Sequence, residues 1–154
     1  MPASVLVIAD RTDIATLIAR CLTGIGLRPL IANDVRHAGL ILQREAPEAV
    51  VLDLATPGHS DAVMQWLRRD PTRATMAIVQ VTSVARSGGM PRGERAHVVV
   101  PKPFTPKQIV DAVRTALVRR IARQRLAAPA PAPPATIAAM RSSAPSTPTD
   151  PSLR

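Results

Sequence analysis

The stretch Ala49-Val50-Val51-Leu52-Asp53-Leu54-Ala55-Thr56-Pro57-Gly58 decides the fold. Its apolar residues follow one another without alternation, which predicts a strand covered by helices on both faces. Pro57 and Gly58 are turn residues that end the strand. Asp53 then lies at the carboxyl end of a buried parallel strand, the edge at which open α/β sheets bind ligands. Because Asp also caps loops, Asp53 is either a site residue or a simple cap at this stage.

Four further segments read as buried or edge strands, and helical patterns separate them. The expected strands are residues 4–9, 28–32, 49–53, 76–81 and 97–100, and the expected helices are 14–22, 35–46, 61–69 and 105–126. Gly88, Gly89, Pro91 and Gly93 would damage a helix interior, so segment 84–96 is expected to hold at most a short helix. The expected helix caps are Asp13, Asn33 or Asp34, Ser60 or Asp61, and Thr105.

This alternation predicts an α/β fold, a doubly wound five-stranded parallel sheet of about 125 residues. Right-handed crossovers bring the strand ends that carry Asp10, Asp53, Thr82 and Lys102 to one edge. Two carboxylates, a hydroxyl and an ammonium at one edge suit an oxyanion bound together with Mg²⁺. An Asp near such a metal can itself attack a phosphoryl donor and form an aspartyl-phosphate.

In these positions residues 4 to about 122 resemble the receiver domain of bacterial two-component response regulators. The matching motifs are Ala9-Asp10, Asp53, Thr82 and Lys102-Pro103-Phe104, in order on the expected elements. The resemblance implies a flavodoxin-like (βα)5 fold and a single-domain response regulator in phosphorelay signal transduction. It implies that Asp53 accepts a phosphoryl group from a histidine kinase or phosphotransfer protein. It also implies that Thr82 and Lys102 bind that group, that the Lys102–Pro103 peptide bond is cis, and that Mg²⁺ is held by Asp10, Asp53 and the backbone carbonyl of Ala55.

The chain also departs from the family pattern. Ala9 replaces the first acid of the usual pair, so we expect weak Mg²⁺ binding, and Arg11 is a candidate for supplying positive charge instead. Ala55 has no polar side chain to guide water, and Val99 stands where the family usually has Tyr or Phe. Two hypotheses therefore remain open: a working receiver that switches protein–protein contacts on phosphorylation, or a degenerate pseudo-receiver that binds partners without phosphorylation.

The net charge of +9 raises the question of nucleic-acid binding, especially through the basic last helix. With one Trp, one Phe and no Tyr, the chain lacks aromatic platforms for single-stranded bases. No helix-turn-helix or other DNA-binding module follows residue 126. We therefore expect protein partners rather than nucleic acid.

The remaining composition points to a protein of the reducing cytoplasm with no enzymatic activity beyond phosphoryl transfer to itself. A single cysteine excludes an internal disulfide, and the three histidines have no metal-ligand spacing. No apolar run is long enough for membrane insertion, and no Gly-rich phosphate loop follows the first strand. Seven prolines crowd the end of the chain, so we expect a receiver-like domain over residues 1–126 and a disordered Pro/Ala/Ser-rich tail over 127–154.

Overall fold

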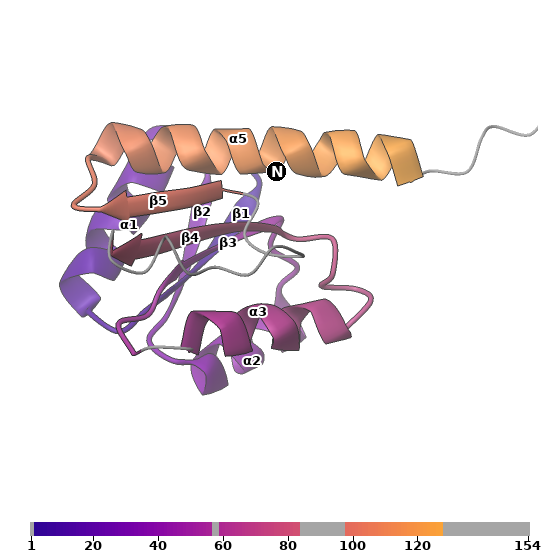
Figure 1. Ribbon diagram of the computed structural model, residues 1–154, viewed down its shortest axis with the longest axis horizontal. Helices are drawn as coiled ribbons and strands as arrows, with labels where there is room; N and C mark the ends of the chain where they lie inside the picture. Colours follow the sequence, from indigo (N-terminus) through magenta and orange to yellow (C-terminus); the bar gives the residue numbers. More distant parts are fainter. Residues whose placement is uncertain (1, 57–58, 84–97, 128–154) are drawn as a thin grey trace, which may run out of the picture.

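The fold is a parallel sheet between two layers of helices (Figure 1). A computed structural model of the chain describes residues 2–56, 59–83 and 98–127. Within these residues the strands are β1 (Ser4–Ala9), β2 (Arg28–Ala32), β3 (Ala49–Asp53), β4 (Ala77–Ser83) and β5 (Val98–Lys102). The helices are α1 (Thr12–Gly24), α2 (Val35–Arg44), α3 (His59–Arg69) and α5 (Pro106–Ala127).

The strands run in the order β2-β1-β3-β4-β5, and all neighbouring pairs are parallel. The central strands β1, β3 and β4 are almost wholly buried, as their continuous apolar sequences require. Pro29 lies in the edge strand β2, where its missing N–H group interrupts no ladder between two neighbours. The predicted doubly wound parallel sheet is confirmed.

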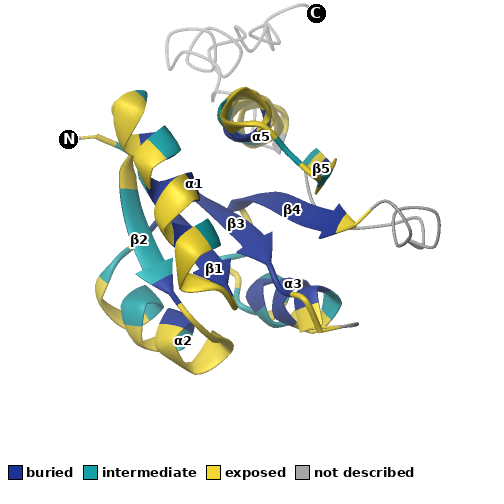
Figure 2. Ribbon diagram, turned by 90° about the vertical axis from the view of Figure 1, so that its left-hand side faces the viewer, coloured by how far each residue is buried: buried dark blue, intermediate teal, exposed yellow. Residues whose placement is uncertain are grey.

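Each face of the sheet has its own hydrophobic core. Val5 and Val7 point toward α1 and α5, whereas Leu6 and Ile8 point toward α2 and α3, because successive side chains of a strand alternate between faces. Figure 2 shows these two pairs of helices on opposite sides of the sheet, with their buried stripes facing it. The sheet thus holds the strand ends in fixed register at one edge.

Of the four predicted helix starts, those of α2 and α5 are confirmed and those of α1 and α3 are wrong. Asp34 caps α2 by accepting a hydrogen bond of 2.7 Å from the backbone N–H of His37. The cap position of α1 is Arg11, without a side-chain cap bond, and Asp13 lies within the first turn. Helix α3 begins at His59, so Ser60 and Asp61 lie inside the helix and do not cap it.

Helix α5 starts as predicted and then continues past the sheet. Thr105 and Gln108 form a capping box: Gln108 N–H donates to Thr105 Oγ1 (3.2 Å) and Thr105 N–H donates to Gln108 Oε1 (2.7 Å). Ile109 and Val113 are buried, but Ile121 is 46% exposed. The helical spacing of Ile109, Val113, Leu117 and Ile121 predicts that all four are buried, which is wrong for Ile121 because the last turns of α5 extend beyond the strands (Figure 1).

Two predictions concern segments that the structure does not describe. The weak helix at 84–96 falls within residues 84–97, and the Pro-rich tail predicted over 127–154 lies outside the described residues from 128 on, so both stay predictions; Ala127 itself is the last residue of α5. None of the helices in the described part of the chain combines the length and the apolarity needed to cross a membrane.

Candidate functional site

Asp53 and Asp10 lie side by side at the carboxyl edge of the sheet. Ala9 of β1 is in register with Asp53 of β3, and the backbone N–H of Asp10 donates to the carbonyl oxygen of Asp53 at 3.3 Å. The side chain of Asp10 is held in turn, because its Oδ2 accepts a 2.6 Å hydrogen bond from the backbone N–H of Ala55. The two strands therefore deliver two carboxylates to one place, as the sequence predicts.

Lys102 makes the closest charged contact of the site. Its Nζ lies 2.5 Å from Oδ1 of Asp53, although β4 separates the strands that carry the two residues. The side chain of Asp53 is only 4% exposed, whereas that of Lys102 is 36% exposed. A buried carboxylate is therefore neutralised by an ammonium that reaches in from solvent. The Lys102–Pro103 peptide bond is cis, which confirms that expectation.

Thr82 lies at the same edge but outside this contact. It is 9% exposed at the end of β4, where Thr82 pairs in register with Pro101 and Ser83 pairs with Lys102. Its hydroxyl donates a long 3.5 Å hydrogen bond to the carbonyl oxygen of Ser83. The four predicted residues thus share one edge, with Asp53 and Lys102 in direct contact and Thr82 beside them.

The number of carboxylates at this edge determines how well the site could hold Mg²⁺. No group of three or more His, Cys, Asp or Glu side chains that could hold a metal ion occurs among the residues described. Ala9, where the family pattern has an acid, is fully buried beside Asp53. Mg²⁺ binds with one or two carboxylates when water and phosphate oxygens complete its octahedron. Asp10 and Asp53 meet that minimal requirement.

Arg11, the candidate for supplying positive charge at the site, pairs with Asp13 instead. Its guanidinium forms a fork on Asp13, with Nε–Oδ1 at 3.1 Å and Nη2–Oδ2 at 2.7 Å, and both side chains are exposed. This hydrogen bond, more than the charge of Arg11 itself, lowers the pKa of Asp13. The idea that Arg11 serves the phosphate site gains no support from this placement.

Gln80 is a polar residue near the site that the sequence analysis did not single out. It is 7% exposed, two positions before Thr82 on β4, and its register partner on β5 is the exposed Val99. Its Oε1 is buried and accepts no hydrogen bond within the part of the chain that the structure describes. The available signal was a single amide in the otherwise apolar run Ala77-Ile78-Val79-Gln80-Val81.

Comparisons with known proteins agree with this geometry. No protein-family model matches the chain. A protein of Porphyridium aerugineum named "Probable transcriptional regulator ycf27" is 32% identical over 117 residues, which are 75% of this chain and 48% of the relative. The protein of the same name from Porphyra purpurea is 31% identical over 120 residues, which are 75% of this chain and 47% of the relative. The chain therefore spans about half the length of these curated relatives.

Solved structures also resemble the chain, and they do so over a whole domain. A "putative response regulator" of Chloroflexus aurantiacus has a TM-score of 0.67 and 25% identity, over 77% of this chain and 100% of that one. A CheY-like response regulator receiver domain protein of Methanospirillum hungatei has a TM-score of 0.66 and 17% identity, over 80% of this chain and 99% of that one. Fold and comparisons agree on the receiver fold, and the chain is similar over a whole domain to response regulators and their receiver domains.

Proposed function

We propose that the chain is a response regulator that accepts a phosphoryl group on Asp53 and thereby changes its contacts with a protein partner. The observation that carries the proposal is the 2.5 Å contact between Lys102 Nζ and the buried Asp53, with Asp10 beside them. A carboxylate that acts as a nucleophile needs a nearby positive charge that leaves one of its oxygens able to react. Lys102 contacts one oxygen of Asp53, and Asp53 lies at the carboxyl edge of the sheet.

In the proposed reaction, a carboxylate oxygen of Asp53 attacks phosphorus as the bond to the donor's leaving group breaks. Lys102 shifts part of its contact to the incoming phosphoryl oxygens, and the hydroxyl of Thr82 turns to donate to one of them. Asp10, Asp53 and the carbonyl of Ala55 would hold Mg²⁺, which would neutralise phosphoryl charge. The donor is a histidine kinase or a phosphotransfer protein, as is general for receiver domains.

The same contact suggests how phosphorylation is transmitted. The aspartyl-phosphate carries a charge of about −1.5 to −2, in place of the single negative charge of the Asp53 carboxylate. Lys102 is the last residue of β5 and Thr82 is the last but one of β4, so a changed charge at Asp53 pulls on both strands. We propose that this movement alters a surface read by a downstream protein, that the chain acts in the cytoplasm, and that it catalyses no other reaction.

Fully buried Ala9 favours the alternative, a pseudo-receiver that binds its partner without phosphorylation. An acid at this position would be the third carboxylate of the usual metal set, and its loss lowers the affinity for Mg²⁺. The two hypotheses differ in one measurable property, which is whether Asp53 reacts at all.

The experiment is incubation with acetyl phosphate and Mg²⁺ followed by intact-mass measurement. We expect a single added phosphoryl group on the wild type and none on Asp53→Asn. Asp111→Asn, which removes an exposed acid of α5, is the matched control and should label like the wild type. Failure of the wild type to label under conditions that label an ordinary receiver would refute phosphorylation of Asp53 and leave the pseudo-receiver as the surviving hypothesis.

A further inference from the structure

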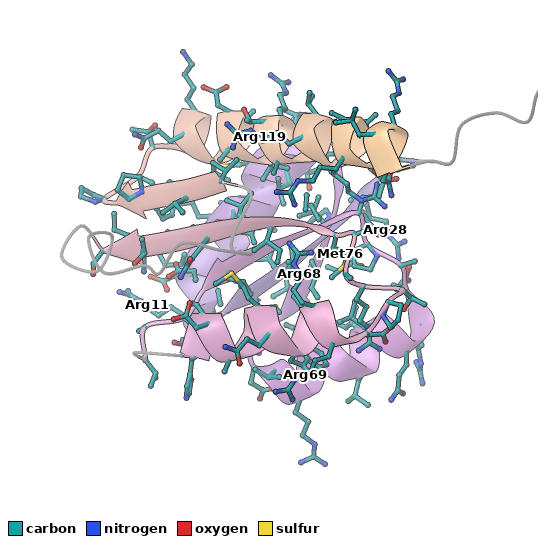
Figure 3. The ribbon with its side chains drawn as sticks, turned by 45° about the vertical axis from the view of Figure 1, so that its right-hand side comes forward. Arg11, Arg28, Arg68, Arg69, Met76 and Arg119 are labelled. Atoms are coloured by element: carbon teal, nitrogen blue, oxygen red, sulfur yellow. The ribbon has the colours of Figure 1, made fainter. Side chains whose placement is uncertain are left out.

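A pocket of about 170 Å³ lies at the edge of the sheet opposite Asp53. Its wall comes from the end of α2, from the residues before β3 and β4, and from Arg120 of α5. Figure 3 places Arg28 and Met76 at this end of the molecule and Arg11 at the other. The pocket is therefore separate from the proposed phosphorylation site.

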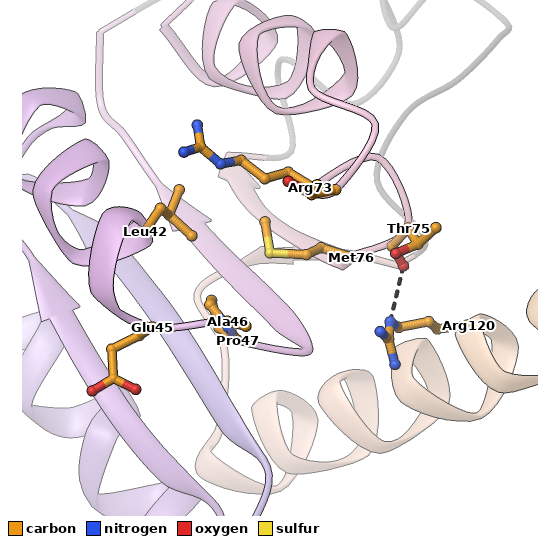
Figure 4. A pocket seen from close by; sticks show the side chains of 9 residues that line it. Leu42, Glu45, Ala46, Pro47, Arg73, Thr75, Met76 and Arg120 are labelled. Carbon is orange, nitrogen blue, oxygen red and sulfur yellow. Dashed lines mark hydrogen bonds between the residues drawn. The ribbon is translucent and has the colours of Figure 1, made fainter.

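Part of the pocket wall is apolar, beside polar and charged side chains. Leu42, Pro47 and Met76 line it, and Met76 is only 3% exposed (Figure 4). Arg68 holds the segment before β4 in place by donating to the carbonyl oxygens of Ala74 and Met76. A ligand with a short aliphatic part would find a preformed apolar surface here.

Arg120 supplies a positively charged side of the pocket. Its Nε donates to the carbonyl oxygen of Thr75 at 2.9 Å, drawn as the dashed line in Figure 4. This bond orients the guanidinium while leaving its other N–H groups as donors, since arginine has five. No carboxylate lies within ion-pair distance of Arg120 in the described residues.

Arg73 lies across the pocket from Arg120 (Figure 4) and is also held in place. Its guanidinium stacks 5.3 Å from the ring centroid of Trp66, and its Nε lies 3.4 Å from Oδ2 of Asp70. The pKa of Asp70 is lowered, chiefly by hydrogen bonds from Thr72, so this carboxylate stays charged and offsets Arg73.

Among the described residues, Glu45 is the only carboxylate that lines the pocket, and it is likewise paired. Arg28 donates to both of its oxygens, at 3.2 and 2.9 Å, and these hydrogen bonds lower the pKa of Glu45. Of the charged side chains that line the pocket, Glu45 and Arg73 each pair with an opposite charge, whereas Arg120 donates to a carbonyl oxygen, so the lining keeps one positive charge, at Arg120.

We infer that this pocket binds a monoanionic carboxylate with a short aliphatic chain. The single uncompensated charge matches one carboxylate, whereas a phosphate dianion would carry more charge than the pocket balances. The pocket is small, about 170 Å³, so the part of a ligand that it holds is short. The carboxylate would pair with Arg120, as the planar fork of arginine favours, and the chain would lie on Met76, Leu42 and Pro47. The same chemistry is available from a free acid or from a glutamate side chain of a peptide.

The test is an NMR titration of the ¹⁵N-labelled, unphosphorylated full chain with butyrate. We expect saturable shifts of the Thr75 and Met76 amides, and weaker binding of acetate and of inorganic phosphate. Arg120→Gln should weaken butyrate binding about tenfold, the effect of losing one charge-assisted contact. Arg119→Gln removes the same charge one residue away and should bind like the wild type.

The inference would be overturned if butyrate caused no chemical-shift changes or if Arg120→Gln bound butyrate as tightly as the wild type. Equal losses of butyrate affinity in Arg120→Gln and Arg119→Gln would overturn it too, as would tighter binding of phosphate than of butyrate. If Arg120→Gln perturbs the whole spectrum, Arg73→Gln is measured in its place. We expect Arg73→Gln to lower the butyrate affinity at least threefold, and an unchanged affinity would overturn the inference. A capped Ala-Glu-Ala peptide that binds more tightly than butyrate would assign the carboxylate to a peptide; weaker binding would assign it to a free acid. Because these proteins are unphosphorylated, the result is independent of Asp53 reactivity.

Discussion

Replacement of Lys102 by Met tests the electrostatics of the site most quantitatively. At 2.5 Å and an effective dielectric constant of about 20, the two charges attract by about 7 kcal/mol before desolvation is subtracted. Because the Lys102 side chain is 36% exposed, hydration competes for it, and the net coupling should be about 1–3 kcal/mol. Lys102→Met should therefore destabilise the fold, since it leaves a buried and unpaired carboxylate at Asp53.

A double-mutant cycle isolates that coupling. Urea unfolding at neutral pH would be measured for the wild type, Lys102→Met, Asp53→Asn and the double variant. We expect Lys102→Met to be clearly less destabilising in the Asp53→Asn background, because the buried charge is then absent. Additive effects, with a coupling below about 0.5 kcal/mol, would refute the account of a neutralised buried carboxylate.

Four further predictions follow from single contacts. Gln80→Leu should raise the free energy of unfolding by about 1 kcal/mol, because it removes a buried amide oxygen that has no partner in the described residues; a loss of stability on urea unfolding would contradict this. Asp34→Ala should lower the free energy of unfolding by about 1 kcal/mol through loss of the α2 cap, and no change would show that the cap is dispensable. Glu45→Gln should lower the thermal midpoint at neutral pH, since pairing with Arg28 lowers the Glu45 pKa and its stabilisation is fully present above the ordinary value of 4.5; the difference from the wild type should shrink below that value and vanish once the pH has fallen through the lowered pKa of the folded state, and a pH-independent difference would exclude the ion pair. Ala9→Asp should raise Mg²⁺ affinity by on the order of tenfold in a titration calorimeter, and unchanged affinity would mean that position 9 does not face the metal.

The sequence was informative about the sheet and its edge because continuous apolar runs have few alternative structures. Strands ending in Asp10, Asp53, Thr82 and Lys102 must meet at one edge once the connections are right-handed, and the contact between Asp53 and Lys102 follows from that topology. The roles of Thr82 and of the Ala55 carbonyl stay predictions.

Helix caps and the burial of single helix residues were less predictable, because several positions along the chain fit the same residue pattern. Asp13 was an acceptable cap in sequence, but its carboxylate pairs with Arg11 and the helix starts earlier. Ile121 keeps the helical spacing of a buried residue, yet no sequence signal tells where the sheet beneath α5 ends. The pocket at Arg120 could not be predicted, because three separate loops and helix ends build it.

The most direct test of the central claim is to map the labelled residue after acetyl phosphate treatment, by trapping the acyl phosphate and sequencing the peptides by mass spectrometry. Our account predicts that the label lies on Asp53 alone and depends on Mg²⁺. A label on Asp10, or on no acid at this edge, would contradict it.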